Sequence, residues 1–403
     1  MNPESRDIAT LLRDPALAPV LAALPHARLA GGAVRDTLLG LAVADIDLAT
    51  PDPPEETLSA LKKAGIRAVP TGLAHGTVTA ISAGRPFEIT TLRTDLATDG
   101  RHAQVAWTAD WRQDAARRDF TINAMSLDRG GRIYDYFGGQ ADLAAGRVRF
   151  VGDAATRITE DYLRILRFFR FQARYGRGPT DAQAAAAIRG HAAGVATLSA
   201  ERVWHELKRI LAAPDPGGAI ASMAALGVLQ IVLPEGANPA RLEALINAGA
   251  PADPMLRLAA LATPNAATLA ARMKMSGAEA AVLAAAQAAP VLHAGLSDND
   301  VRRLLADHDL AVLTASTWLS GPAGAEGAAL RERLLTTPPP RFPLEGRHAL
   351  ALGAAPGPAV GEALRAVRQW WLAGGCTADE AACNDALRAA LARAGGLPAV
   401  HPS

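Results

Sequence analysis

The chain has 403 residues, of which 50% are hydrophobic, and a formal net charge of +1, so it is long enough for two or more domains with packed cores. It contains no apolar stretch of about 20 residues, the length that spans a bilayer, which excludes a membrane-spanning protein. The first residues are charged and lack an apolar segment of the signal-peptide type, so we expect a cytoplasmic location.

The first predicted element is a strand over residues 26–30 that runs into the glycine pair Gly31 and Gly32. Glycine allows backbone N–H groups to approach phosphate oxygens closely. A short helix then begins at Arg35 and ends at Gly40. The segment is not a Walker loop, because no GKS or GKT sequence follows the glycines. We take Gly31, Gly32 and Arg35 as candidate nucleotide-binding residues.

Two aspartates one residue apart, Asp45 and Asp47, come directly after this helix. Alternate side chains of a strand share a face, so both carboxylates should point one way while Ile46 and Leu48 point into a core. Carboxylates about 6.6 Å apart along a strand suit Mg²⁺ ions that hold a nucleoside triphosphate. Alone, such a pair is more often a solvated face. The order of strand, glycine pair, helix and aspartate pair favours phosphoryl or nucleotidyl transfer.

Short runs of alternating apolar and polar residues then predict further strands of a mixed sheet. These runs cover residues 77–81, 86–92, 132–137 and 147–151. Beyond residue 158 the chain is rich in alanine and leucine at helical spacing. The predicted fold class is therefore α+β, a mixed-sheet head followed by an all-helical neck, body and tail. The predicted domains are residues 1–140, 141–215, 216–330 and 331–403.

Glu88 lies in the second of these strands, on the opposite side from Phe87 and Ile89. A third carboxylate on a neighbouring strand would suit a two-metal transferase, so Glu88 is a candidate catalytic residue. An exposed glutamate on an edge strand explains the pattern equally well.

The sequence ARRDFTINAM, residues 116–125, contains charged and polar groups suited to a phosphate-transfer site. Arg118 can neutralise the charge that builds up as pyrophosphate leaves. Asp119 and Asn123 offer polar contacts to a sugar or to loop backbone. The alternative is the N-terminus of a helix, with an aspartate cap followed by core residues.

A helix is predicted over residues 158–176, with Asp161 and Arg164 on one face. The plain interpretation is a surface salt bridge. A functional interpretation follows from hydrogen bonding, because adenine and cytosine both present an amine donor beside a ring-nitrogen acceptor. A carboxylate only accepts and a guanidinium only donates, so this pair would accept A and C and reject G and U.

The motifs GGAVRDTLLG (residues 31–40), DIDLAT (45–50) and ARRDFTINAM (116–125) resemble those of the class II polymerase-β-like nucleotidyltransferases. This group contains the tRNA CCA-adding enzymes and the bacterial poly(A) polymerases. The resemblance covers about residues 27–211 well and the rest thinly. Residues 72–81 are more similar to CCA-adding enzymes than to poly(A) polymerases.

The resemblance implies a metal-dependent enzyme that uses Mg²⁺, bound by Asp45 and Asp47, with tRNA, ATP and CTP as partners. It implies that Asp161 and Arg164 select the base. Residues that would bind the nucleotide, by resemblance or from the sequence, also include Arg118, Asp119, Arg167 and Arg170.

Three longer segments also have counterparts in the resembled family. Residues 93–114 are similar to a flexible loop that closes over the nucleotide. Residues 199–211 are similar to the neck helix, with Ser199 as its N-cap. Residues 343–364 are similar to the part of bacterial CCA-adding enzymes that holds tRNA away from the active site.

Aromatic and sulfur side chains near the C-terminus have simpler interpretations. Trp370 and Trp371 either stack on RNA or form a core pair. Cys376 and Cys383 are too few for a disulfide framework or a zinc site, so we expect packing residues.

Three functions are consistent with these features. The first is a CCA-adding tRNA nucleotidyltransferase. The second is a poly(A) polymerase, or an enzyme of the same family that adds only CC or only A. The third is a catalytically silent RNA-binding scaffold, which the presence of both metal aspartates disfavours.

Overall fold

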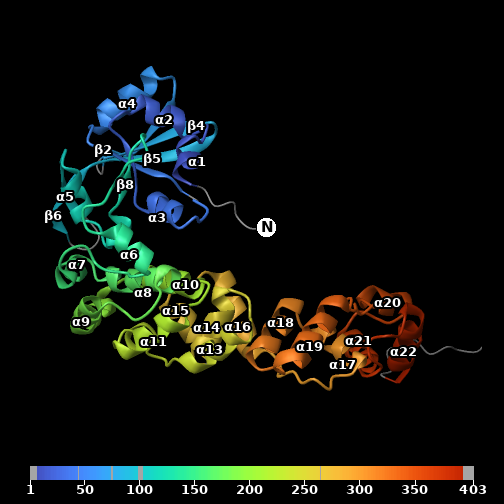
Figure 1. The fold of residues 1–403 in the computed structure, drawn as a ribbon. Coiled ribbons are helices and arrows are strands. Elements are labelled where there is room, and N and C mark those ends of the chain that lie inside the picture. Colours follow the sequence, from blue (N-terminus) through green and yellow to red (C-terminus); the bar gives the residue numbers. More distant parts are fainter. Residues whose placement is uncertain (1–6, 44, 74–75, 99–102, 264, 394–403) are drawn as a thin grey trace, which may run out of the picture. The chain divides into compact units, whose positions relative to one another are not determined.

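The computed structural model describes residues 7–43, 45–73, 76–98, 103–263 and 265–393 (Figure 1). Residues 74–75 of the segment 72–81, and residues 99–102 of the segment 93–114, lie outside the described residues. The chain forms two compact units, Met1–Pro239 and Ala240–Ser403.

The first unit begins with a seven-stranded mixed sheet in the order β3-β4-β5-β2-β1-β8-β9. Its strands are β1 (Arg28–Ala30), β2 (Asp47–Thr50), β3 (Arg67–Gly72), β4 (Thr77–Ser82), β5 (Arg85–Thr91), β8 (Ser126–Leu127) and β9 (Ile133–Tyr134). β2 and β5 pair in parallel, whereas the other neighbours are antiparallel. Leu29, Leu48 and Ile89 are register partners across β1, β2 and β5, and each is at most 1% exposed. This row fixes the three strands that carry the site.

Helices of the head connect and flank these strands. They are α1 (Ile8–Leu12), α2 (Ala18–Ala23), α3 (Gly32–Leu38), α4 (Pro54–Lys63), α5 (Trp111–Ala116) and α6 (Gly139–Ala145). The sequence of α4 favours a helix at both ends. Proline occupies its first position, acidic residues lie in its first turn, and lysines lie in its last turn. Together with α2, it packs against the side of the sheet formed by β3 and β4.

The strand predictions were right for residues 77–81 and 86–92 and wrong for part of the rest. Residues 132–137 form only the two-residue β9, and residues 147–151 form no strand. In the latter run only Phe150 makes a β-bridge, to Phe120. Its ring lies 5.7 Å from that of Phe168, so the alternation reflects packing on an aromatic cluster rather than a sheet ladder.

Residues 93–114, expected to be a loop, contain regular structure. β6 (Arg93–Thr98) and β7 (Ala103–Trp107) form a separate two-stranded sheet, and α5 begins at Trp111. Polar residues and a central glycine favoured the loop interpretation. The structure shows that these two runs pair with each other as antiparallel strands.

The remainder of the first unit is helical, which confirms the helical spacing predicted beyond residue 158. Its helices are α7 (Ala154–Glu160), α8 (Leu163–Tyr175), α9 (Ala182–His191), α10 (Ala200–Leu211), α11 (Gly217–Ala225) and α12 (Leu229–Val232). α8 buries Ile165, Phe168 and Phe169 on one face and packs against α10. Ser199 does precede α10 as its N-cap residue, but its side chain makes no capping hydrogen bond.

The second unit is entirely helical in its described part. Its helices are α13 (Pro239–Asn247), which begins at the last residue of the first unit, α14 (Pro254–Leu261), α15 (Ala266–Arg272), α16 (Gly277–Ala288), α17 (Asp298–Asp307), α18 (Leu310–Leu319), α19 (Gly324–Thr336), α20 (Gly346–Ala351), α21 (Pro358–Ala373) and α22 (Glu380–Arg393). Over the described ranges of the whole chain, no helix is long and apolar enough to cross a membrane. The mixed sheet followed by helices confirms the predicted α+β class.

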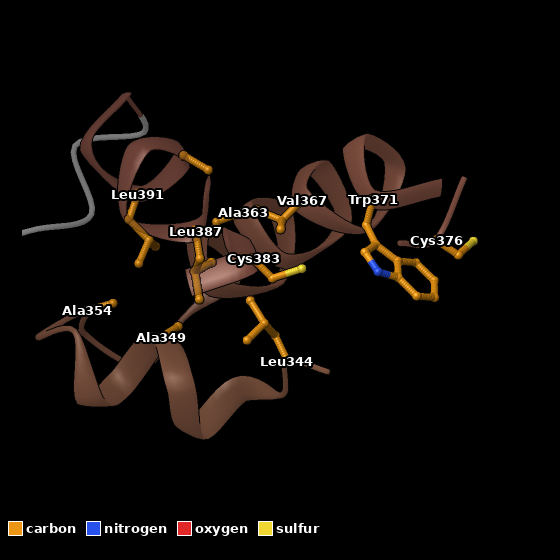
Figure 2. Close-up of a cluster of buried hydrophobic side chains, with 11 residues drawn as sticks. Leu344, Ala349, Ala354, Ala363, Val367, Trp371, Cys376, Cys383, Leu387 and Leu391 are labelled. Atoms are coloured by element: carbon orange, nitrogen blue, oxygen red, sulfur yellow. The ribbon is translucent and has the colours of Figure 1, made fainter. Parts of the chain in front are cut away.

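A hydrophobic cluster of α20, α21 and α22 decides the roles of the C-terminal aromatic and sulfur side chains (Figure 2). Trp371, Cys376 and Cys383 are buried in it, which confirms the cysteines as packing residues. Trp371 is therefore not free to stack on RNA. Trp370 is 48% exposed, so the two tryptophans do not form a core pair.

Candidate functional site

A cavity of about 470 Å³ in the first unit collects most of the predicted site residues. It is lined by Ala30, Gly31, Gly32, Arg35, Asp47, Arg117, Arg118, Asp119, Asn123, Asp161, Leu163, Arg164, Arg167, Phe171 and Arg202. Asp45, Glu88 and Arg170 were also predicted site residues, but they are not among the lining residues.

The glycine turn after β1 forms one wall of this cavity. Gly31 has a φ of +65°, a conformation that glycine adopts without the steric cost of a side chain. A Cβ atom at this position would lie 3.0 Å from Nη1 of Arg118. The glycine therefore serves both the turn and the close approach of the arginine.

α3 begins at Gly32, three residues earlier than predicted, which places Arg35 inside the helix. Its side chain is only 7% exposed and donates hydrogen bonds to Asp36 and Asn123. The hydroxyl of Tyr175 donates to the same Asp36 carboxylate at 2.9 Å. Burial raises the pKa of Tyr175 to about 12, so this hydroxyl remains a donor near neutral pH.

The aspartate pair follows the predicted alternation. Ile46 and Leu48 are buried, whereas Asp45 and Asp47 are exposed. β2 itself begins only at Asp47, so Asp45 stands just before the strand. Glu88 is the register partner of Asp47 on the parallel strand β5, which puts the third carboxylate beside the pair.

These carboxylates repel one another. The pKa of Asp47 is raised, first by partial burial in the cavity and then by the charges of Glu88 and Asp45, while Arg118 opposes the shift. A cation bound here would relieve the repulsion, and carboxylate oxygens are the donors that hard divalent ions prefer. The donor chemistry of the site thus fits such an ion.

The described residues contain no group of three or more His, Cys, Asp or Glu side chains arranged to hold a metal ion. Mg²⁺ commonly binds through one or two carboxylates and takes its other ligands from substrate phosphates and water.

Arg117 and Arg118 are held at the cavity by Asp114 of α5. Arg117 donates to Oδ1 of Asp114 at 2.8 and 2.9 Å, and Arg118 donates to Oδ2 at 3.3 Å. Burial opposes the charge of Asp114, yet Arg118 and Arg117 hold its pKa below the usual value. This buried anion orients two cations that line the cavity.

Asp119 is buried and uses both oxygens within the protein. Oδ1 accepts from the backbone of Phe120 at 2.9 Å and from Asn123 at 3.0 Å, and Oδ2 accepts from Arg167 at 2.6 and 2.7 Å. Burial works against the carboxylate charge, but Arg167 lowers the pKa of Asp119. In this arrangement Asp119 fixes Arg167.

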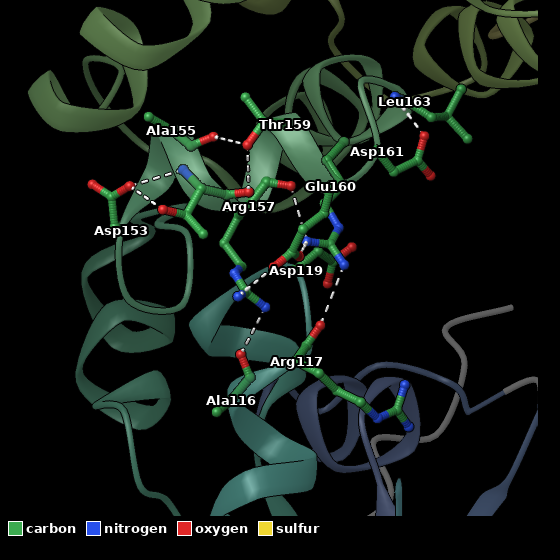
Figure 3. A network of polar contacts seen from close by, with 12 residues as sticks. Ala116, Arg117, Asp119, Asp153, Ala155, Arg157, Thr159, Glu160, Asp161 and Leu163 are labelled. Carbon is green, nitrogen blue, oxygen red and sulfur yellow. Dashed lines mark hydrogen bonds and ion pairs between the residues drawn. The ribbon is translucent and has the colours of Figure 1, made fainter. Parts of the chain in front are cut away.

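The single helix predicted over residues 158–176 is interrupted at Asp161, a correction with consequences for the site. α7 ends at Glu160, Asp161 is extended with a φ of −159°, and α8 begins at Leu163. The side chain of Asp161 accepts a hydrogen bond from the backbone of Leu163 at 3.0 Å (Figure 3). This local bond competes with helix continuation, as short polar side chains commonly do.

Asp161 and Arg164 consequently do not form a helical ion pair, but both line the cavity. Oδ2 of Asp161 accepts from Arg202 of α10 at 2.7 Å. Arg164 donates to Glu160 and to the carbonyl oxygen of Arg157. Each side chain is thus held by its own partners.

Arg170 does not line this cavity, unlike the other predicted nucleotide-binding residues. It donates to Glu206 of α10 at 3.0 Å, and desolvation lowers the pKa of Arg170 to about 10.

Sequence reasoning did not select Arg117 or Arg202 as site residues. Arg117 stands next to a selected arginine, whereas the only sequence signal for Arg202 was its place on the charged face of an amphipathic helix.

Two family models match the first unit. Residues 27–149 match the Poly A polymerase head domain, and residues 181–238 match the probable RNA and SrmB-binding site of polymerase A. Sequence relatives include the mitochondrial CCA tRNA nucleotidyltransferase 1 of Danio rerio, 49% identical over 209 residues, which are 50% of this chain and 48% of that protein. The CCA-adding enzyme of Streptococcus pyogenes is 40% identical over 213 residues, 52% of each chain. The chain thus matches about half the length of these relatives.

Solved structures resemble the chain over more of its length. The CCA-adding enzyme of Bacillus stearothermophilus in complex with CTP has a TM-score of 0.73 at 24% identity, covering 95% of this chain and 99% of that one. The Thermotoga maritima CCA-adding enzyme complexed with tRNA has a TM-score of 0.69 at 20% identity, covering 96% and 99%. At these identities the likeness establishes the fold.

Proposed function

We propose that this chain, whose residues 27–149 match the Poly A polymerase head domain, is a CCA-adding tRNA nucleotidyltransferase. It would add C, C and A to tRNA 3′ ends from CTP and ATP, without a nucleic-acid template. One observation carries the proposal: a single cavity brings together Asp47, Arg118 and the pair Asp161 and Arg164. These residues supply the groups needed for phosphate transfer and for base selection.

The reaction joins the tRNA 3′-oxygen to the α-phosphate of the nucleotide and breaks the bond to the β-phosphate, so that pyrophosphate leaves. We propose that Asp45 and Asp47 hold Mg²⁺, which when bound activates the attacking hydroxyl and stabilises the charge on the phosphates. The glycine turn presents backbone N–H groups to the triphosphate. Arg118, fixed by Asp114, lies where it can neutralise the departing pyrophosphate.

Base selection is assigned to Asp161 and Arg164. Each Asp161 oxygen accepts one protein hydrogen bond, from Leu163 or from Arg202, and retains capacity to accept from the exocyclic amine of adenine or cytosine. Arg164 then donates to the ring nitrogen. We propose that Arg202 acts as a positioning residue, because it fixes the orientation of Asp161.

Two further assignments belong to the proposal. Glu88 is a candidate third carboxylate, supported by its register with Asp47.

A cytoplasmic location is also proposed. Because the Danio rerio relative is named as mitochondrial, the compartment needs a direct test by microscopy of a tagged protein in its own cell.

The deciding experiment incubates the protein with tRNA lacking its 3′ end and with labelled CTP or ATP. Incorporation of C, C and A followed by arrest supports the proposal. Long A tracts would identify a poly(A) polymerase, and incorporation of only CC or only A would identify a partial enzyme. Retained tRNA binding without incorporation would identify a silent scaffold.

A further inference from the structure

A second cavity of about 350 Å³ adjoins the first in the same unit. It is lined by Arg35, Arg170, Phe171, Arg174, Tyr175, Arg209, Ala212 and Ala213. Arg35 and Phe171 also line the first cavity, so the two spaces share part of their walls. The functions assigned above leave this arginine-rich cavity without a role.

The inner arginines of the second cavity are neutralised and fixed. Arg35 pairs with Asp36 at 2.9 Å, and Arg170 pairs with Glu206 at 3.0 Å. The guanidinium of Arg35 lies 4.3 Å from the ring centre of Tyr175, and that of Arg170 lies 4.9 Å from the ring centre of the largely buried Phe171. These contacts fix the orientation of the two guanidinium groups in the wall of the cavity.

The outer arginines carry charge that the protein does not neutralise. Arg174 and Arg209 are both exposed, and neither forms an ion pair with another described residue. Arg174 lies against the ring of Tyr175, 5.5 Å from its centre. The cavity therefore holds two guanidinium groups in excess over its carboxylates, which suits a phosphate group.

We propose that this cavity binds a backbone phosphate of the RNA substrate, upstream of the 3′ end that reacts in the first cavity. The inference rests on the proposed function. An RNA strand is favoured over a second nucleotide because the surplus charge lies at the exposed rim, where a long chain leaving the first cavity can pass. Free pyrophosphate offers the same chemistry, so the test must separate the two sources.

The test variant is Arg174→Gln combined with Arg209→Gln. Its matched control is Arg67→Gln combined with Arg129→Gln, which removes the same charge from two exposed arginines that line neither cavity and lie outside the matched RNA-binding segment. The dissociation constant for tRNA lacking its 3′ end is measured at several salt concentrations. The Michaelis constant for CTP and the inhibition constant of pyrophosphate are measured at saturating tRNA, and thermal melting checks folding.

We expect the test variant to bind tRNA roughly 5- to 30-fold more weakly than the control, with the slope of log affinity against log salt reduced by about 1. The constants for CTP and pyrophosphate should match those of the control. Equal tRNA affinity in the two variants would refute the site. Weaker pyrophosphate inhibition with unchanged tRNA binding would assign the cavity to the leaving group and also refute it.

This binding measurement is independent of the reaction. Wild-type protein that incorporates nucleotides, combined with a test variant that binds tRNA normally, would reject the phosphate site and leave the proposed function intact. Wild-type protein that incorporates nothing would reject the function instead. If melting shows the double variant to be unfolded, the single variants Arg174→Gln and Arg209→Gln decide by the same measurements.

Discussion

Two groups of acidic side chains near the first cavity differ in whether nearby arginines neutralise their charge. On the sheet side, Asp47 faces Glu88 and Asp45, and its pKa is raised. On the side of α5 and the loop that follows it, Asp114 and Asp119 are buried against arginines, and their pKa values are lowered. Paired carboxylates hold the site together, whereas the charge of the repelling ones is only partly offset by Arg118, and a bound cation would offset the rest.

The largest expected effect comes from removing a repelling carboxylate. Asp47→Asn should reduce the rate of nucleotide transfer by about 10³-fold or more, since metal ions supply several kcal/mol of transition-state stabilisation. We expect the same of Asp45→Ala and Asp47→Ala. Binding of tRNA should remain largely intact in all three, as measured by filter binding beside the transfer assay. Full activity in any of them would remove the basis for the metal assignment.

Removing a paired carboxylate should instead cost stability. Asp119→Asn removes a buried carboxylate and leaves the partly buried guanidinium of Arg167 without its anionic partner. The free energy of unfolding should fall by about 3 kcal/mol. Urea unfolding measures this change, and Asp298→Asn on the exposed surface of the second unit serves as the control. A loss no larger than that of the control would contradict a structural role for the buried pair.

Removing the Asp161 carboxylate should weaken the choice between bases. Asp161→Ala should reduce discrimination between CTP and UTP by about 10- to 100-fold, because one charge-assisted hydrogen bond is lost. The rate with CTP should fall less than the discrimination does. Steady-state kinetics with both nucleotides provides the measurement. Unchanged discrimination would show that another residue selects the base.

The positioning residue should have a smaller effect of the same kind. Arg202→Leu removes the hydrogen bond to Oδ2 of Asp161 but leaves the bond from the Leu163 backbone. We expect discrimination between CTP and UTP to fall by about 3- to 10-fold. Arg202→Lys should restore part of it, whereas a purely structural role would lower stability without changing base choice.

The smallest effect is a difference in pH dependence between the two kinds of carboxylate. A lowered folded-state pKa gives stability that is present above the usual value of 3.8 and lost as pH falls through the folded value. The cost of Asp119→Asn should therefore shrink between pH 7 and pH 3. Asp47 has a raised pKa, so Asp47→Asn should slightly stabilise the protein at pH 7, and this gain should vanish at low pH. Parallel urea titrations at both pH values test the opposite signs.

The sequence alone determined the change from a mixed-sheet head to helices and most of the lining of the cavity. Alternation exposed Asp45 and Asp47 and buried Ile46 and Leu48, and helical spacing marked the change to helices. Such patterns succeed because burial on one face follows directly from local geometry.

Only the tertiary structure decided which of these groups are neutralised and by what. It broke the predicted helix at Asp161, paired Asp161 with Arg202, fixed Arg167 on Asp119 and moved Arg170 to a second cavity. Ion pairs between residues 48 and 41 positions apart have no local signature, because they depend on how α8, α10 and the loop after α5 pack together. The charge that remains unpaired after this packing is what defines the site.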